Sequence, residues 1–298
     1  MSKPHKGALR MKDPVIIIGM HRSGTSMLTK TLQQAGLFMG EDRDPNDESL
    51  FFLEFNNWIL EQVHATWDFP EPYEYANDTI KKYIIDIYKA RVKSKAIQKY
   101  WGIKKYIKYT KLQAINIPWG WKDPRNSLTI DIWKSIYPNA KIIHIYRNPI
   151  DVAYSLKQRA LEEEHNFIKQ KNFNPKKYQL LERNLRYTGS FRIMDMQHGY
   201  ELWKHYVSKS MKEMQALHIK YEELLSHPKD QLTSIFNYLG IDVSQEQTIS
   251  FSQSFNQNRK YAFINNKELV DFYKSIQNDP IMKDLSYDKI EEIGNNFE

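Results

Sequence analysis

Cysteine is absent from all 298 residues of the chain. This absence excludes disulfides, thiolate zinc sites and cysteine nucleophiles, and it is typical of proteins that work in a reducing cytoplasm, where we expect this one. The nine histidines show no metal-ligand spacing, so we expect no metal site. Long apolar runs are lacking as well. No stretch approaches the roughly 18 apolar residues of a membrane-spanning helix, and the basic N-terminal segment has no signal-peptide core.

The composition is that of a globular protein, with 41% hydrophobic and 13% aromatic residues. Short apolar segments alternate with helical patterns, which predicts an α/β fold in which helical layers cover both faces of a central parallel sheet. We expect a single domain over residues 1–298, with its core at about 14–240, a helical insertion at about 76–114 and a lid-like excursion at about 160–195. The expected strands are Val15–Ile18, Ile115–Lys122, Lys141–Tyr146 and Leu217–Tyr221.

The net charge of +7 is concentrated in one region. Between Thr79 and Leu112 the chain has ten lysines and one arginine but a single acidic residue, Asp86. Such a region is either a solvated helical face or a surface that attracts an anionic partner, such as an acidic glycan. No nucleic-acid-binding module is recognisable, so we expect no nucleic-acid partner.

The most informative local pattern is Gly19–Ser26, which reads G-x-x-x-x-G-T-S between a buried strand and a helix. This arrangement aims backbone N–H groups and a helix N-terminus at an anion, and it predicts a P-loop-type three-layer sandwich. In nucleotide triphosphatases the residue before the Ser/Thr is a lysine. Here that position is Thr25, and the basic residue of the loop is Arg22. The loop therefore predicts an anion other than ATP.

A second anion site is predicted where the Lys141–Tyr146 strand ends. Arg147 follows the strand directly, and Ser155 lies two turns into a helix that begins at Pro149. The guanidinium and the hydroxyl can therefore both reach one phosphate. A P-loop ATPase would carry an aspartate at such a strand end to hold magnesium, whereas an arginine would repel the metal.

Four segments in this order resemble the superfamily of sulfotransferases that use 3′-phosphoadenosine 5′-phosphosulfate (PAPS). The HRSGTS loop is similar to the family's 5′-phosphosulfate loop, and YRNPIDVAYS is similar to its 3′-phosphate segment. WGWKDPR resembles the second core strand, which ends in a lysine, and YEEL resembles a late segment near the adenine. The segments run from about residue 14 to 240 and look most like those of bacterial members.

The resemblance implies PAPS as the cofactor and 3′,5′-ADP as its product. It implies that the loop cradles the 5′-phosphosulfate, that Arg147 and Ser155 hold the 3′-phosphate, and that Tyr221 packs near the adenine. Arg259 is a further candidate for contact with the 3′-phosphate. The loop residues assigned to the cofactor are His21, Arg22, Ser23, Gly24, Thr25 and Ser26.

The resemblance also suggests catalytic residues. Lys122, at the strand end of WGWKDPR, would neutralise oxygens as the sulfuryl bond breaks. The acceptor must lose a proton, and Glu48 is the first candidate for the base because it begins an E-x-x-F-F pattern similar to that of some glycan sulfotransferases. The competing carboxylates are Glu54, Asp123, Glu41 and Asp42.

We therefore predict a sulfotransferase that moves a sulfuryl group from PAPS to a hydroxyl or amine acceptor, with an acidic glycan as a candidate. Two alternatives stay open. One is a nucleotide kinase of the same fold, and the other is a non-catalytic protein that binds an anion or glycan and retains the fold.

Overall fold

The computed structural model describes residues 13–108, 117–170 and 187–290. Contacts within the chain group it into two units. The first consists of Met1–Arg147 and Tyr206–Tyr261, and the second of Asn148–His205 and Ala262–Glu298. The sheet and the Gly19–Ser26 loop belong to the first unit. This division into contact units does not test the single domain expected from the sequence, which stays a prediction.

The described residues of the first unit form a four-stranded parallel sheet in the order β2-β1-β3-β4. Ile17 at its centre pairs with Lys122 on one side and with Ile143 on the other. Every residue of β1 is buried, as a central strand with helices on both faces requires. The strands are β1 (Val15–Ile18), β2 (Gly120–Lys122), β3 (Lys141–Tyr146) and β4 (Leu217–Lys220).

All four expected strands are present, with two differences at their ends. The second strand begins at Gly120: of its expected range, residues 115–116 lie outside the described residues and residues 117–119 precede the strand. The fourth strand stops at Lys220, one residue earlier than expected, because Tyr221 is already the first residue of a helix.

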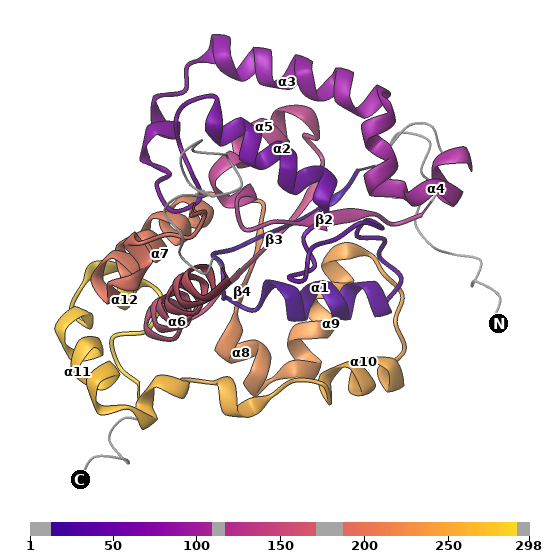
Figure 1. Ribbon diagram of the computed structural model, residues 1–298. Coiled ribbons are helices and arrows are strands. Elements are labelled where there is room, and N and C mark those ends of the chain that lie inside the picture. The colour runs from indigo at the N-terminus through magenta and orange to yellow at the C-terminus, as the bar shows by residue number, and fades with distance from the viewer. Residues whose placement is uncertain (1–12, 109–116, 171–186, 291–298) are drawn as a thin grey trace. The chain divides into compact units, whose positions relative to one another are not determined.

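Helices cover both faces of this sheet. Figure 1 shows α1 and α9 on one face and α2 and α5 on the other. The predicted α/β sandwich with a central parallel sheet is therefore confirmed. The α-helices of this unit are α1 (Thr25–Gln34), α2 (Leu50–Glu61), α3 (Asp78–Lys93), α4 (Gln98–Lys108), α5 (Asn126–Ile136), α8 (Tyr221–Ser226), α9 (Pro228–Leu239) and α10 (Gln245–Ser252). Its short 3-10 helices are η1 (Glu71–Tyr75), η2 (Lys95–Ile97) and η7 (Gln257–Arg259).

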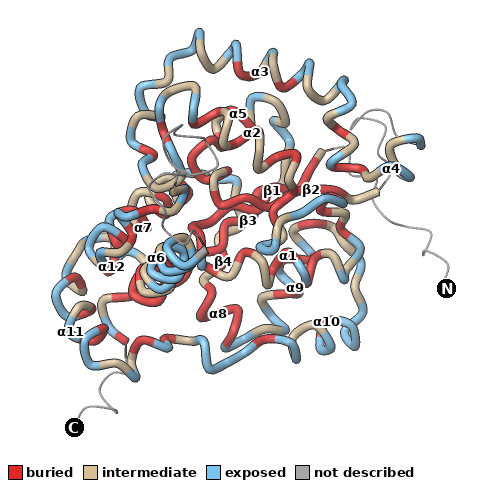
Figure 2. Tube along the Cα trace, in the orientation of Figure 1, coloured by how far each residue is buried: buried red, intermediate tan, exposed pale blue. Residues whose placement is uncertain are grey.

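Two different cores pack against the sheet, in which β1 and β2 are buried along their length and β3 is buried between its two end residues (Figure 2). On the side of α2 and α5 the core is aromatic: Phe52 stacks on Trp121 with ring centroids 3.9 Å apart, and Trp133 packs edge-on to Trp121. On the side of α1 and α9 the core is aliphatic, with Leu28 of α1 and Ile235 of α9 fully buried. Burial of these side chains is the main force that holds the layers together.

The second unit is helical in its described residues. The helix that follows the third strand is fixed at its start by Asp151, whose carboxylate accepts hydrogen bonds from Asn148 Nδ2 and from the backbone N–H groups of Ala262 and Phe263. The elements are α6 (Pro149–Gln170), η6 (Arg192–Met194), α7 (Met196–Met211, whose last residues from Tyr206 belong to the first unit), η8 (Ala262–Asn265), α11 (Lys267–Ile276) and α12 (Pro280–Asp284).

The two expected insertions are described in part. The insertion at about 76–114 is helical over α3 and α4, and its last residues lie outside the described part. Of the excursion expected at about 160–195, the first residues up to Gln170 continue α6, and residues 171–186 lie outside the described part. Each helix in the described ranges is too short or too polar to cross a bilayer.

Candidate functional site

The loop between β1 and α1 has the backbone turns that an anion-binding loop needs. Arg22 has φ 70° and Gly24 has φ 93°, both in the left-handed region. At Gly24 only a glycine fits, since a Cβ there would lie 2.5 Å from the ring of Tyr221. The loop is fixed from a second element by the backbone N–H of Gly19, which donates to Ser127 Oγ at 3.0 Å.

The electrostatics of this loop favour an anion. It leads into the N-terminus of α1, whose first turn carries no acidic residue, so the positive end of the helix dipole is not neutralised there. The Ser23 hydroxyl is buried and has no hydrogen-bond partner among the described residues. A buried donor of this kind is costly unless a ligand uses it. The loop residues present therefore fit a phosphate or sulfate group.

The other loop residues differ in exposure. Arg22 is exposed, and Thr25 is buried at the start of α1. The His21 ring is buried and packs edge-on to Trp67, with centroids 4.8 Å apart. His21 thus packs against the aromatic connection after α2, as the sequence reasoning allowed.

Lys122, at the end of β2, meets the loop at a single backbone oxygen. Lys122 Nζ donates to the carbonyl of Asn46 at 2.5 Å, and Ser26 Oγ donates to the same carbonyl at 2.6 Å. Lys122 is only 1% exposed, although an isolated lysine is costly to bury. The structure thus brings the predicted catalytic lysine to the first turn of α1.

Glu48 is the acidic partner of this lysine. Its Oε1 lies 3.3 Å from Lys122 Nζ, and its Oε2 lies 3.1 Å from the guanidinium of Arg125. Asp44 fixes the turn that carries it, since the Asp44 carboxylate accepts from Glu48 N and Asp44 N donates to the Glu48 carbonyl. Burial, reinforced by the charge of Asp123, raises the pKa of Glu48 above its usual value, although Lys122 and Arg125 act in the opposite direction.

Asp123 supports the Glu48–Lys122 pair indirectly, through Arg125. It is fully buried, and its carboxylate accepts hydrogen bonds from Arg125 Nη1 at 2.9 Å and from Asn56 Nδ2 at 2.9 Å. Burial acts to lower the pKa of Arg125, but the negative charges of Asp123 and Glu48 outweigh it and raise that pKa. Asp123 therefore orients Arg125, which in turn holds Glu48.

The other candidate carboxylates lie toward α3 and α4. Glu54 on α2 is 40% exposed and forms ion pairs with Arg91 at 2.8 Å and with Lys99. Glu41 forms an ion pair with Lys105 at 2.7 Å, and Asp42 is exposed beside it. Of the five candidates, only Glu48 and Asp123 share a hydrogen-bonded cluster with Lys122.

Arg147 occupies the strand end that the sequence assigned to a second phosphate. Its guanidinium carbon lies 4.9 Å from the centre of the Tyr221 ring, and its NH2 donates to the Arg259 carbonyl at 2.7 Å. Because the Tyr221 ring also lies against Gly24, it joins the loop to Arg147. Arg259 takes part through its backbone. Ser155 belongs to α6 in the second unit, and its role with Arg147 stays a prediction.

Three residues of the cluster have no role in the sequence reasoning. Arg125 is visible there only as the last letter of WKDPR, although a charged residue three positions after a strand end was a usable signal. Asn46 takes part through its backbone carbonyl, and because every residue has one, the residue type gives no sign of this role. Asn56 becomes a partner of Asp123 only when α2 packs on α5. Within the described residues, no group of three or more His, Asp or Glu side chains could hold a metal.

A phosphate-type loop, a buried lysine from the neighbouring strand and a second arginine site on a parallel sheet define a P-loop-type α/β protein built to bind a multiply charged anion. A sequence model described as the sulfotransferase family matches residues 14–245. The chain therefore belongs to the sulfotransferase family. The family implies PAPS as the sulfate donor. No curated protein sequence matches the chain.

Several solved sulfotransferases are similar to the chain at low identity. A sulfotransferase from Alicyclobacillus acidocaldarius is 15% identical, with 94% of this chain and 98% of that one covered and a TM-score of 0.47. Mouse sulfotransferase SULT7A1, complexed with PAP, is 15% identical over 92% of this chain and 87% of that one, with a TM-score of 0.42. Sulfotransferase STF9 from Mycobacterium avium is 14% identical over 88% and 75%, with a TM-score of 0.42. Because all three TM-scores are below 0.5, the family assignment rests on the match of residues 14–245 to the family's sequence model and not on these structures.

Proposed function

We propose that the protein transfers the sulfuryl group of PAPS to a hydroxyl or amine of an acceptor molecule in the cytoplasm. The observation that carries this proposal is the buried Glu48–Lys122 ion pair at the phosphate-type loop. In a family member, a base beside a lysine at the donor loop is the pair that acceptor activation and charge neutralisation require.

The cofactor-binding residues fall into two groups. The loop from His21 to Ser26 would hold the 5′-phosphosulfate, with the buried Ser23 hydroxyl as a donor. Arg147, fixed by Tyr221 and by the Arg259 carbonyl, would hold the 3′-phosphate as a planar fork, and Ser155 would add a hydroxyl. When bound, PAPS supplies the sulfuryl group that is transferred.

The catalytic roles follow from the charges of the cluster. Lys122, which forms a buried ion pair with Glu48, would neutralise negative charge on oxygen as the sulfuryl bond breaks. Glu48 would accept the acceptor's proton, and its raised pKa makes it a stronger base than an ordinary glutamate. Asp123 and Arg125 would hold Glu48 in place, because Asp123 is buried and accepts a hydrogen bond from Arg125, which pairs with Glu48.

The test is transfer of labelled sulfate from PAPS to a panel of glycans, phenols, peptides and lipids. A sulfated product is expected from at least one class. Thermal unfolding with 3′,5′-ADP and, separately, with ATP checks the donor, and we expect 3′,5′-ADP to raise the melting temperature. Stabilisation by ATP alone would indicate a kinase. Stabilisation by 3′,5′-ADP without transfer to any acceptor would indicate a protein that only binds.

A further inference from the structure

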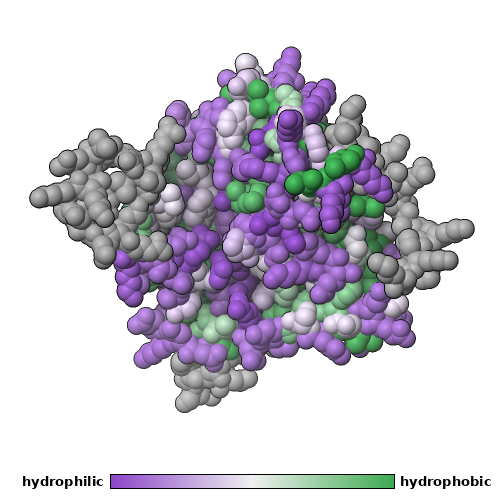
Figure 3. Space-filling model, turned by 45° about the vertical axis from the view of Figure 1, so that its right-hand side comes forward, coloured by the Kyte–Doolittle hydropathy of each residue, from purple (hydrophilic) through white to green (hydrophobic). Residues whose placement is uncertain are grey.

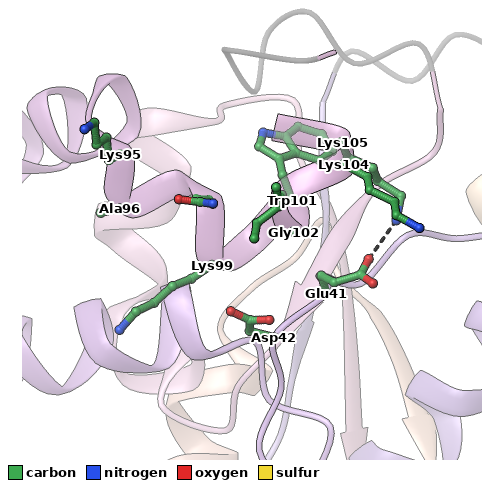
Figure 4. Close-up of a pocket in the computed structure, with 11 residues that line it drawn as sticks. Glu41, Asp42, Lys95, Ala96, Lys99, Trp101, Gly102, Lys104 and Lys105 are labelled. Carbon is green, nitrogen blue, oxygen red and sulfur yellow. Dashed lines mark hydrogen bonds and ion pairs between the residues drawn. The ribbon is translucent and has the colours of Figure 1, made fainter. Parts of the chain in front are cut away.

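An open hollow of about 660 Å³ lies beside the sheet, at the break in α4. Gly102 makes this break with φ 68° and ψ 162° in the middle of the helix. A Cβ at Gly102 would lie 2.8 Å from Glu41 Cγ, so the glycine allows Glu41 to approach the helix. Figure 4 shows Trp101 and Gly102 at the centre, with lysines and two carboxylates around them.

The lining is basic at its rim and partly apolar inside. Four lysines line the hollow, and two of them, Lys99 and Lys105, form ion pairs with glutamates. Lys95 and Lys104 are exposed and have no carboxylate partner among the residues that the structure describes. Seen from the side of α4, the surface is mostly hydrophilic with hydrophobic residues among it (Figure 3). Ile103, which lines the hollow, is 67% exposed.

Two carboxylates belong to the same lining. Glu41 uses one oxygen for its ion pair with Lys105, and the Asp42 side chain has no hydrogen-bond partner among the described residues. Carboxylates beside a polyphosphate would repel it. They accept hydrogen bonds readily from hydroxyl groups, however, while the lysines pair with acidic groups. The mixture therefore favours a ligand that carries both acid groups and many hydroxyls.

The hollow is connected to Glu48 by a short turn. Backbone bonds from Glu41 N to the Tyr100 carbonyl and from Asp42 N to the Lys99 carbonyl attach the start of this turn to α4. Asp44, two residues after Asp42 and so within about 8 Å of it, bonds to the backbone of Glu48. A chain molecule bound in the hollow thus lies next to the turn that carries the proposed base.

We infer that this hollow is the acceptor subsite and that it takes an acidic oligosaccharide, with Lys95 and Lys104 pairing with its acid groups and Asp42 accepting from its hydroxyls. This inference rests on the proposed function, because it names the acceptor class of the same site. It also gives the basic region between Thr79 and Leu112 a location for its partner.

The test measures binding of two probes, an oligogalacturonate and a heparin-derived oligosaccharide, by calorimetry at low salt. The variant K95Q/K104Q should weaken binding by about tenfold, the loss expected for two exposed charge pairs. The control K82Q/K229Q removes the same charge from exposed lysines outside the hollow and should leave affinity within about twofold. Asp42→Asn should weaken binding of the oligosaccharides, whose hydroxyls lose a carboxylate acceptor, and should strengthen binding of a single-stranded oligodeoxynucleotide of similar charge, because a repelling carboxylate is removed.

Several results would overturn the inference. The first is that the natural chain binds neither oligosaccharide. The second is that K95Q/K104Q and K82Q/K229Q lose affinity for the oligosaccharides equally. The third is that K95Q/K104Q loses affinity only for the oligodeoxynucleotide or for anionic phospholipid vesicles. Binding of 3′,5′-ADP, measured on the same samples, separates this failure from that of the proposed function. If the natural chain binds 3′,5′-ADP but the hollow variants bind oligosaccharide normally, only the subsite is wrong. If 3′,5′-ADP does not bind, the proposed function itself fails.

Discussion

At the scale of single residues, the site is a balance of buried charges. Glu48 and Asp123 face Lys122 and Arg125, so each buried charge has a partner of opposite sign. Removing one member of such a group usually destabilises it, because the remaining charge stays buried. Here the two cations keep other acceptors if Glu48 becomes neutral, since Lys122 still donates to Asn46 and Arg125 to Asp123. Glu48 can therefore be tested without unfolding the protein.

Glu48→Gln should lower kcat for sulfate transfer by about 100-fold or more, because an amide cannot accept the acceptor's proton. The dissociation constant of 3′,5′-ADP should stay unchanged. Glu54→Gln is the matched control, since Glu54 is tied to Arg91 and Lys99, and its rate should remain close to that of the natural chain. Transfer at the natural rate by the Glu48→Gln protein would eliminate Glu48 as the base.

Arg147→Ala should weaken binding of 3′,5′-ADP by about 10- to 100-fold, the value of one or two hydrogen bonds to a charged group. Arg147→Lys should recover only part of this loss, because an ammonium keeps the charge but lacks the planar fork. Arg43→Ala removes an exposed arginine of an ion pair with Asp47 and serves as the control. Equal affinity in all three variants, measured by calorimetry, would contradict the assignment of Arg147.

At the scale of elements, one asparagine links α2, β2 and α5. Asn56 Nδ2 donates to Asp123 and to Asn126 Oδ1, and Asn56 Oδ1 accepts from Thr129 and Trp133. All four of its partners are buried, so no water is available to replace a lost bond. The position of α2 against the sheet is thus coupled to the position of the Asp123 carboxylate.

Asn56→Ala should lower the free energy of unfolding by about 2 kcal/mol, since it leaves several buried polar groups without partners. It should also lower kcat more than it changes KM. Without Asn56 the Asp123 carboxylate is held less firmly, and Asp123 in turn positions Arg125 and Glu48. The neighbouring Asn57→Ala, at a half-buried side chain that is not part of the described network around Asn56, should change stability by less than about 0.5 kcal/mol. Urea unfolding measures the stability of both variants, and initial rates measure their activity. Equal effects at the two positions would refute a special role for Asn56.

A second element-scale feature joins β3 to β4. His144 and His218 lie side by side in register, with their Nδ1 atoms 2.9 Å apart, so a hydrogen bond between them needs an unprotonated Nδ1 on one of the two rings. Burial and the neighbouring histidine lower the pKa of His144 to about 3, and burial also lowers that of His218. Below pH 6.5 the unfolded chain therefore binds protons that the folded chain excludes.

Stability should fall as the pH drops from about 6.5 toward 3, by about 2 kcal/mol at pH 5 from His144 alone. Replacing both rings in His144→Val/His218→Val should flatten this part of the pH profile in urea unfolding. His227→Gln, at an exposed histidine of the same unit, is the control and should leave the profile as it is. A profile that keeps its full slope in the double variant would exclude the pair as the cause.

At the scale of the whole molecule, much of the architecture is predictable from the sequence. The parallel sheet, the loop and the strand-end Arg147 are local patterns of apolar runs, glycines and charges. What the sequence could not show is which carboxylate meets Lys122. Glu48 and Glu54 both lie near the start of α2, and only the packing of α2 and α3 turns one toward the sheet and the other toward Arg91. Contacts made by backbone atoms, such as the carbonyls of Asn46 and Arg259, are equally invisible.

The uneven charge of the whole chain has a kinetic consequence. With a net charge of +7 and its lysines gathered on α3 and α4, the protein should attract acidic acceptors over distances of about one Debye length. We therefore expect kcat/KM for an acidic oligosaccharide to fall steeply as salt rises from 0.05 to about 0.5 M. A neutral acceptor of the same length should show little change. Equal salt dependence for both would contradict electrostatic attraction as the cause.

The shared carbonyl of Asn46 has a consequence for the order of events in the reaction. Ser26 donates its single hydroxyl proton to this carbonyl, so a ligand that accepts from Ser26 must replace the carbonyl, whereas the Lys122 ammonium has three N–H groups and can keep its bond to Asn46. Asn46 stands two residues before Glu48 in one turn, and that turn is also fastened to α4. If the sulfate donor accepts from Ser26, we therefore expect the Asn46 carbonyl to lose one of its two hydrogen bonds, which would link occupancy of the loop to the position of the turn that carries Glu48.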